Sequence, residues 1–396
     1  MACLASDAGL AAPAIYLDAS ATTPPAPEVL AEMAELHGRA WANPSSLHGF
    51  GLAAAEALEQ ARWRCAAVLG CSPPELVFTS GGSEAIHLAL LGHANAVRPG
   101  RLLISTVEHP ASEAAATQLQ HRGWQVRRLP VDGQGRLDLT ALEDSLEPPT
   151  QLVSLIWGQN EVGTLQDLEA IGRLCRQAGV PLHVDAVQVV GHLPLRFAEL
   201  PVDLLSLAAH KFQGPKGVGA LLVREGLALK PLIGGGGQEG GRRGGTEAVA
   251  LAGGLARALE LADSRGAAGL SRLRDGLLNH LMELDGVRLS GPDPRRQLDQ
   301  RLPHHLSLLV GDGHGRPLSG RALVRELWRE GYAVSSGSAC SSTGSGGSAV
   351  LRAMGYDGAE AASGLRLSLG PWLSPDDLQG VPAALERARH RLTPTP

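Results

Sequence analysis

The sequence predicts an α/β protein with a large domain on a doubly wound, mainly parallel seven-stranded sheet and a smaller α+β domain. Two observations carry this prediction. From residue 76 to residue 223, short apolar segments typical of buried strands alternate with helical segments, as in open sheets with helices on both faces. After a glycine-rich run at 234–245, two long helical stretches are followed by short, separated strands.

The strands of the large domain are predicted from short apolar runs. They cover residues 76–79, 102–105, 124–129, 152–156, 181–184, 202–207 and 217–223. Helices are predicted directly after the first strand, at 111–121 and at 167–178. The last of these is amphipathic, because Leu168, Ile171 and Leu174 fall on one helical face.

The smaller domain is predicted from elements that no longer alternate regularly, which is typical of an α+β arrangement. Helices are predicted at 246–263, 267–284, 319–330 and 374–390, and strands near 286–289, 304–309 and 365–369. We therefore predict a large domain over residues 15–258. The small domain would comprise residues 1–14 and 259–396.

Charge and cysteine content argue against several kinds of partner and site. The net charge is −5, so we expect no nucleic-acid partner. No apolar run reaches the ~20 residues of a membrane span, and the N-terminus shows no signal segment, so we expect a cytoplasmic protein without membrane contact. The five cysteines are scattered without a Cys-x-x-Cys pair, which argues against a metal site of the protein's own and for a reduced compartment.

Lysine is scarce, since the chain has only Lys211, Lys216 and Lys230 beside 32 arginines. Only lysine can form a Schiff base with a carbonyl cofactor, because the arginine guanidinium stays protonated. Lys211 follows the predicted strand at 202–207 and has His210 beside it, where an open α/β sheet binds its ligands. If the protein uses pyridoxal 5′-phosphate (PLP), Lys211 is therefore the candidate.

Two further strands end in groups that suit a PLP site. Gly82 and Ser83 follow the first strand, where backbone amides and a hydroxyl could bind a phosphate. His109 follows the second strand and could stack on an aromatic cofactor or relay protons. Each signal alone is also compatible with an ordinary capped turn or a structural histidine.

The next strands along the chain add an amide and a carboxylate. Asn160 follows the strand at 152–156, and its amide could bind a phenolic oxygen. Asp185 ends another strand, with Gln188 three residues later. PLP needs a carboxylate beside its pyridine nitrogen, and a buried carboxylate needs a partner. The strand ends together therefore favour a PLP site.

One cysteine and one arginine indicate the reaction. Cys340 lies in a Ser/Gly-rich loop at 334–347, and such loops are typically exposed. An exposed thiol reacts as a thiolate, whereas a buried one is inert, so we predict that Cys340 is a nucleophile. Arg366 stands in the middle of a predicted strand, where a guanidinium needs an anion such as a substrate carboxylate.

Several motifs together resemble a known family. They are the segments 16–24, 43–48, 108–110, 160–163, 185–188, 210–211 and 235–239, and the string Ser-Ser-Gly-Ser-Ala-Cys-Ser-Ser at 335–342. Over almost its whole length the chain resembles cysteine desulfurases of the NifS/IscS type, within the class V aminotransferases. The resemblance implies the PLP-dependent transferase fold of type I, with the cysteine loop in the small domain.

The resemblance also implies roles around the cofactor ring. Lys211 would bind PLP covalently and later move the proton of the substrate Cα. Asp185 would pair with the pyridine nitrogen, and His109 would stack on the ring. Asn160 and Gln188 would contact the phenolic oxygen.

For the phosphate, the resemblance implies a shared site. Ser83, His210 and the amide of Gly82 would bind the phosphate within one chain, and Thr246 would reach the phosphate of the partner subunit in a homodimer. The family usually has a serine at the position of Ala208. One phosphate contact is therefore expected to be missing.

For the substrate, the resemblance implies that Arg366, with Asn43 nearby, binds the carboxylate of L-cysteine. Cys340 would attack the sulfur, giving L-alanine and a persulfide on Cys340. The sulfur would pass to an acceptor protein such as an iron–sulfur scaffold, and Cys340 could transiently ligate an iron–sulfur cluster there. The family usually has asparagine at the position of Ala19.

The residues leave other readings open. A PLP-dependent cysteine or cystine C–S lyase would need Lys211 and Arg366 but no nucleophilic thiol. A selenocysteine lyase or an aminotransferase would share the fold. A non-catalytic sulfur carrier would need no cofactor, whereas the chain keeps Lys211, Asp185 and His109 together.

Overall fold

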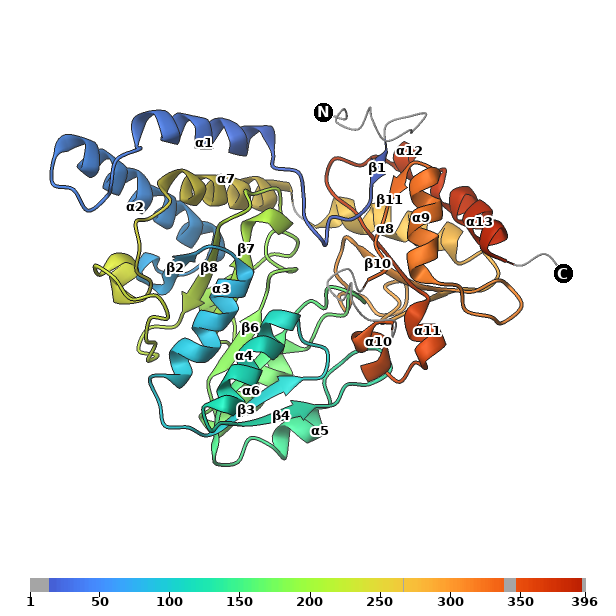
Figure 1. Ribbon diagram of the computed structural model, residues 1–396, viewed down its shortest axis with the longest axis horizontal. Coiled ribbons are helices and arrows are strands. Elements are labelled where there is room, and N and C mark those ends of the chain that lie inside the picture. The colour runs from blue at the N-terminus through green and yellow to red at the C-terminus, as the bar shows by residue number, and fades with distance from the viewer. Residues whose placement is uncertain (1–13, 266, 338–346, 394–396) are drawn as a thin grey trace.

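The computed structural model of the chain describes residues 14–265, 267–337 and 347–393. Its larger part is built on a seven-stranded sheet (Figure 1). In spatial order the strands are β2 (Leu76–Thr79), β8 (Gly219–Val223), β7 (Leu204–Ala208), β6 (Leu182–Asp185), β5 (Thr150–Ile156), β3 (Arg101–Ser105) and β4 (Gln125–Leu129). Within this sheet β8 runs in the direction opposite to that of the other six strands. The predicted mainly parallel, seven-stranded sheet is therefore confirmed.

Helices cover both faces of this sheet. Alternate residues of a strand point to opposite faces, so Leu205 and Leu207 pack in one apolar cluster and Leu204 in another. The first cluster includes residues of α1 (Pro27–Arg39), α2 (Gly49–Leu69), α5 (Leu139–Glu143), α6 (Leu168–Ala178) and α7 (Val249–Arg265). The second includes residues of α3 (Gly82–His87), a π-helical turn (Leu88–Gly92) and α4 (Pro110–His121). The doubly wound arrangement follows from this packing.

A smaller part of the chain contains an antiparallel three-stranded sheet. Its strands, in spatial order, are β12 (Gly364–Ser368), β10 (His305–Val310) and β9 (Val287–Leu289). Around it lie α8 (Ala268–Leu281), α9 (Gly320–Arg329), α10 (Ala349–Ala353), α11 (Gly358–Ala362), α12 (Pro375–Leu378) and α13 (Val381–Leu392). Short 3₁₀ turns are formed by Pro73–Glu75, Phe197–Glu199, Ala209–Lys211 and Gln238–Gly241.

The N-terminal segment belongs to this smaller part. β1 (Ile15–Tyr16) pairs in parallel with β11 (Tyr332–Ala333), and Leu17 is fully buried in the apolar core of the smaller part. Helix α7 runs unbroken through residues 258 and 259, where the sequence placed a boundary. The division into domains at that point stays a prediction.

Within the described ranges, no helix combines the length and apolarity needed to cross a bilayer. No group of three or more His, Cys, Asp or Glu side chains in these ranges is placed to bind a metal ion.

Candidate active site

The predicted site residues meet at one edge of the large sheet. Parallel strands have their carboxyl ends at the same edge, and this is where open α/β sheets bind ligands. Ser83 lies in the first turn of α3, which follows β2, and the turns after β3, β5 and β7 carry His109, Asn160 and Lys211, respectively. Asp185 is the last residue of β6, which lies between β5 and β7. The fold therefore brings together groups that are up to 128 residues apart (83 to 211).

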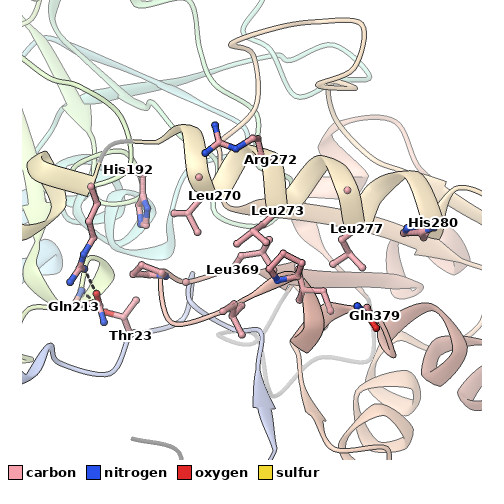
Figure 2. Close-up of a pocket in the computed structure, with 18 of the residues that line it drawn as sticks. Thr23, His192, Gln213, Leu270, Arg272, Leu273, Leu277, His280, Leu369 and Gln379 are labelled. Atoms are coloured by element: carbon pink, nitrogen blue, oxygen red, sulfur yellow. Dashed lines mark hydrogen bonds between the residues drawn. The ribbon is translucent and has the colours of Figure 1, made fainter.

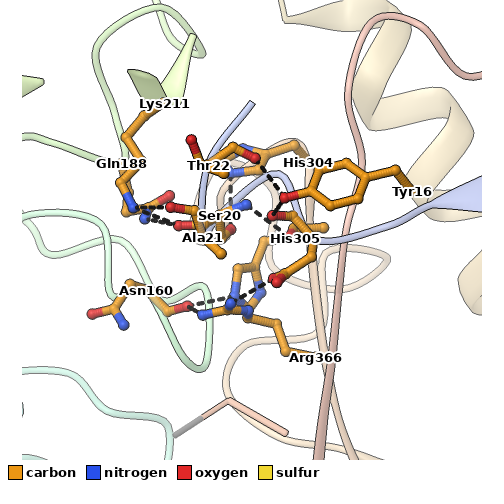
Figure 3. A network of polar contacts seen from close by, with 12 residues as sticks. Tyr16, Ser20, Ala21, Thr22, Asn160, Gln188, Lys211, His304, His305 and Arg366 are labelled. Carbon is orange, nitrogen blue, oxygen red and sulfur yellow. Dashed lines mark hydrogen bonds and ion pairs between the residues drawn. The ribbon is translucent and has the colours of Figure 1, made fainter. Parts of the chain in front are cut away.

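Lys211 lies in a 3₁₀ turn directly after β7, and its amine is held by the N-terminal segment. Lys211 Nζ donates hydrogen bonds to the main-chain oxygens of Ser20 at 2.7 Å and of Ala21 at 2.9 Å (Figure 3). The neighbouring His210 is fixed in the same way, since its carbonyl accepts from Thr23 Oγ1 at 2.9 Å and its Nδ1 lies 3.1 Å from Thr22 Oγ1. The segment 20–23 therefore positions the lysine.

Asp185 and His109 form the inner wall of this edge. Asp185 is buried, and one carboxylate oxygen accepts the Val187 amide at 3.0 Å. Burial raises the pKa of Asp185, although His109 and Lys211 oppose this. His109 Nδ1 accepts the Ala111 amide at 3.1 Å as the N-cap of α4, so the proton of a neutral His109 lies on Nε2. Burial lowers the pKa of His109.

A small pocket of about 350 Å³ lies beside the turn after β2. It is lined by Ala21, Thr22, Ser80–Glu84, His210 and Lys216–Val218. Gly82 lets the chain pass close to Val187, because a Cβ at this position would lie 2.8 Å from a methyl group of that side chain. The predicted phosphate-binding residues Gly82, Ser83 and His210 therefore share one pocket.

Gln188 and Asn160 lie near the same segment. Gln188 Nε2 donates to the Ser20 carbonyl at 2.8 Å, while its buried Oε1 has no hydrogen-bond partner among the described residues. The Asn160 carbonyl accepts from His305 Nε2 at 3.1 Å and from Arg366 Nη1 at 2.9 Å. Gln188 therefore offers an unused acceptor, and the main chain of Asn160 is held against the smaller part of the chain.

Arg366 is buried in β12, and the anion that its burial requires is provided by Asp18. Arg366 Nη2 lies 2.7 Å from Asp18 Oδ1, whereas its buried Nε has no partner among the described residues. Sequence reasoning predicted the anion but not this carboxylate. Asn43 is exposed between α1 and α2, and its Oδ1 accepts the Ser45 amide; the described structure shows no hydrogen bond between it and Arg366.

The glycine-rich run at 234–245 is held at two points. Glu239 is buried, forms a two-pronged ion pair with Arg62 and accepts the Phe78 amide of β2 at 2.8 Å. Arg243 pairs with Glu84 at 2.9 Å. The run also folds back on itself, because a Cβ on Gly244 would lie 2.6 Å from the main chain of Gly234. Thr246, which follows the run, is exposed. Cys340 lies outside the described residues.

A larger pocket of about 1280 Å³ lies on another side of the Lys211 turn (Figure 2). Thr23, His192 and Gln213 line it where it meets the large sheet, and Leu270, Leu273 and Leu277 of α8 line it along the smaller part of the chain. The Lys211 turn therefore separates two pockets of different character, one small and polar and the other mainly apolar.

Glu108, beside His109, is a buried residue to which sequence reasoning gave no role. Glu108 Oε1 accepts from Ser105 Oγ at 2.5 Å and from the Ile156 amide at 3.0 Å. Burial raises the pKa of Glu108 to about 8, and the nearby Asp185 charge adds to this shift. The Glu-His-Pro motif at 108–110 marks this position in the sequence, but the motif alone does not show that the Glu108 carboxyl is buried.

The Glu108→Gln variant is expected to flatten the pH dependence of stability in the cofactor-free chain. From about pH 4.5 to about pH 8 the unfolded carboxyl is ionised while the folded one stays protonated, so this group lowers the free energy of unfolding as pH rises. The Glu108 carboxyl contributes at most about 1.4 kcal/mol per pH unit to the slope of the free energy of unfolding against pH. Urea unfolding across this range measures it, and equal slopes in both proteins would contradict the assignment.

Comparison with known proteins agrees with this geometry. Over residues 15–381 the chain matches the family described as Aminotransferase class-V. The chain belongs to this family. Cysteine desulfurase IscS of Dictyoglomus turgidum is 37% identical over 384 residues, which cover 96% of this chain and 95% of the relative.

Two solved structures are also similar over most of their length. A NifS-like protein has a TM-score of 0.85 and 35% identity, covering 96% of this chain and 99% of its own. SspA, solved in complex with cysteine, has a TM-score of 0.78 and 31% identity, covering 91% and 99%. The resemblance to cysteine desulfurases and the fold of type I are therefore confirmed.

The family implies dependence on PLP, and the residues present fit this group. Asp185 is a buried carboxylate that lacks an ion-pair partner among the described residues, and a pyridinium N–H would supply one. Gln188 Oε1 is a buried acceptor that a ligand could satisfy. The pocket beside Ser83 and His210 has the amides and hydroxyls that a phosphate needs.

Proposed function

We propose that this chain is a PLP-dependent cysteine desulfurase, which removes sulfur from L-cysteine and leaves L-alanine. The single observation that carries the proposal is Lys211, one of three lysines, whose amine is held at the sheet edge that also bears Asp185 and His109. The names of the relatives support the same activity. The test is incubation with L-cysteine while alanine, sulfide and protein-bound persulfide are followed together. Persulfide and alanine in equal amounts would support the proposal.

When bound, PLP would act as the electron sink that makes the substrate Cα proton acidic. Lys211 Nζ would bind the cofactor and move this proton. Asp185 would keep the pyridine nitrogen protonated, and His109 would lie against the ring. The side chains of Gln188 and Asn160 would contact the phenolic oxygen.

The phosphate and the substrate carboxylate would be bound by separate groups. Ser83, His210 and the Gly82 amide would bind the phosphate. Arg366, which already holds Asp18, would bind the substrate carboxylate together with Asn43. Its Nε, which has no partner in the part of the chain that the structure describes, offers a further donor for this role.

Cys340 would receive the sulfur. Its thiolate would attack the substrate sulfur, so that an S–S bond forms while the Cβ–S bond breaks and the carbon takes up a proton to give alanine. The persulfide would then pass to an acceptor protein, for which an iron–sulfur scaffold is the candidate. The thiol and the substrate together supply all the atoms and electrons of this transfer.

We also propose that the protein is a homodimer whose sites draw on both chains. Large apolar side chains are exposed along α1, α2 and their connection, among them Trp41 at 67%, Phe50 at 64% and Trp63 at 63%. The rings of Trp41 and Phe50 lie 5.8 Å apart, and exposed apolar patches commonly mark interfaces. The anchored glycine-rich run would then present Thr246 to the phosphate site of the partner.

Mixing a Lys211→Ala chain with a Thr246→Ala chain is expected to restore activity. In the mixed dimer, one site has Lys211 from one chain and Thr246 from the other, whereas each homodimer lacks one of them in both sites. Alanine production by the mixture, compared with the two separate variants, measures the recovery. A monomer by light scattering, or a mixture no more active than its parts, would argue against a shared site.

A further inference from the structure

Two buried histidines, His192 and His304, stack on each other behind the Lys211 turn. Their ring centroids lie 3.8 Å apart with an angle of 21° between the planes, and 6% and 0% of the two residues are exposed. His192 follows β6, and His304 directly precedes β10 in the smaller part of the chain. The stack therefore joins the two parts of the molecule close to the lysine.

The stack connects the main chain of Lys211 with its amine. His192 Nε2 lies 3.1 Å from the Lys211 carbonyl; because a carbonyl only accepts, Nε2 donates this hydrogen bond. On the other ring, His304 Nε2 lies 3.4 Å from Ser20 Oγ (Figure 3). The Ser20 carbonyl in turn accepts from Lys211 Nζ. A closed chain of contacts thus runs from the lysine backbone through two rings and Ser20 to the lysine amine.

Both rings stay neutral at neutral pH, so the stack does not repel itself. Burial lowers the pKa of His192 to about 4. Burial holds the pKa of His304 well below its usual range, and His192, His305, Arg366 and Arg274 add to this effect. Since protonation of one ring would place a charge against its neighbour in a buried site, the contact belongs to the neutral state.

We propose that His192 and His304 are positioning residues for Lys211, which fix the Ser20 carbonyl that holds its amine. This carbonyl also accepts from Gln188 Nε2, and the Ser20 amide donates to Ser368 Oγ at 2.8 Å. A fixed carbonyl stabilises the ammonium form of Lys211, because it accepts a hydrogen bond from that form. The inference rests on the proposed function only in taking Lys211 as the residue that binds PLP.

The test compares the His304→Leu and Ser20→Ala variants by competitive acylation of the full, cofactor-free chain with acetic anhydride. Lys216 and Lys230 serve as internal references, so the readout is the rate at Lys211 relative to theirs. We expect this ratio to rise about fivefold, which corresponds to the net free energy of one ordinary hydrogen bond. His304→Asn, whose amide can again reach Ser20, is expected to restore the ratio. Ser290→Ala is the matched control, since Ser290 is fully buried and bonds to Ser307 in the small sheet.

The outcomes distinguish residues that position the Lys211 amine from residues that only stabilise the fold. A rise at Lys211 alone supports the proposal, whereas an unchanged ratio or an equal rise at all three lysines overturns it. If His304→Leu does not fold, Ser20→Ala carries the test, because it removes only one hydroxyl. In the PLP-loaded protein, kcat is expected to fall about fivefold in Ser20→Ala with little change in KM. A raised KM at constant kcat would also overturn the proposal. Because acylation requires no turnover, failure of the proposed desulfurase activity would be seen separately.

Discussion

The Lys211→Ala variant is expected to lose covalent attachment of PLP and to lose at least about three orders of magnitude in turnover, since one side chain would both bind the cofactor and move a proton. Neither of the other two lysines is expected to replace it, because Lys230 is exposed after β8 and Lys216 lines the small pocket beside Ser83, whereas the Lys211 amine is held by Ser20 and Ala21. Borohydride reduction of the loaded protein followed by peptide mapping identifies the modified lysine.

The matched control for this experiment is Lys230→Ala, which removes an exposed side-chain amine. The main-chain amide of Lys230 donates to the Gly92 carbonyl, and the substitution keeps this amide. This variant is expected to keep both the reduced label and the turnover. A label on Lys216 or Lys230 in the unmodified protein would refute the assignment of Lys211.

The Cys340→Ala variant is expected to separate cofactor capture from sulfur transfer. It should bind PLP and react with L-cysteine to change the absorbance of the cofactor, yet form neither persulfide nor alanine, because no thiolate remains to take the sulfur. Spectra and product analysis of the same sample measure both properties. Undiminished alanine formation would contradict the role of Cys340 as the sulfur acceptor, and pyruvate with sulfide in place of alanine would favour a C–S lyase that needs no thiol. A preference for selenocysteine would favour a selenocysteine lyase.

A second cysteine provides the control for that variant. Burial, together with the nearby Glu75, raises the pKa of Cys71 to about 12, so this thiol is inert near neutral pH. Cys175 is buried and its pKa is also raised to about 12. Cys71→Ala is therefore expected to retain full persulfide formation, and loss of persulfide in this variant would place the acceptor thiol elsewhere.

The sheet and its edge could be predicted because their signals are local. The strands are short apolar runs, and parallel strands leave their last residues at one edge, so Asp185 and Lys211 could be placed together without coordinates. Helices α1 and α2 were not predicted. Much of the buried face of α2 is built from small residues such as Ala54, Ala57 and Ala61, which give a weaker periodic signal than leucine.

The contacts that hold the site could not be predicted, because they carry little sequence signal. The Lys211 amine bonds to main-chain oxygens of Ser20 and Ala21, which any residue possesses. The burial of Arg366 indicated an anion, but Asp18 is 348 residues away in the chain and only the fold brings it near. The stack of His192 on His304 likewise depends on how the two parts of the molecule meet.

The contacts between the N-terminal segment and β12 join residues that are far apart in the sequence, and this distance affects the order in which parts of the chain can fold during synthesis. Asp18 and Ser20 are among the first described residues to leave the ribosome, whereas their partners Arg366 and Ser368 emerge 348 residues later. The strands of the large sheet are complete by residue 223, well before that point. A nascent chain could therefore fold its large sheet while the residues around Lys211 still lack their tether, because contacts so distant in sequence close late. The contacts that hold the N-terminal segment beside Lys211 would therefore close only after most of the chain has been made.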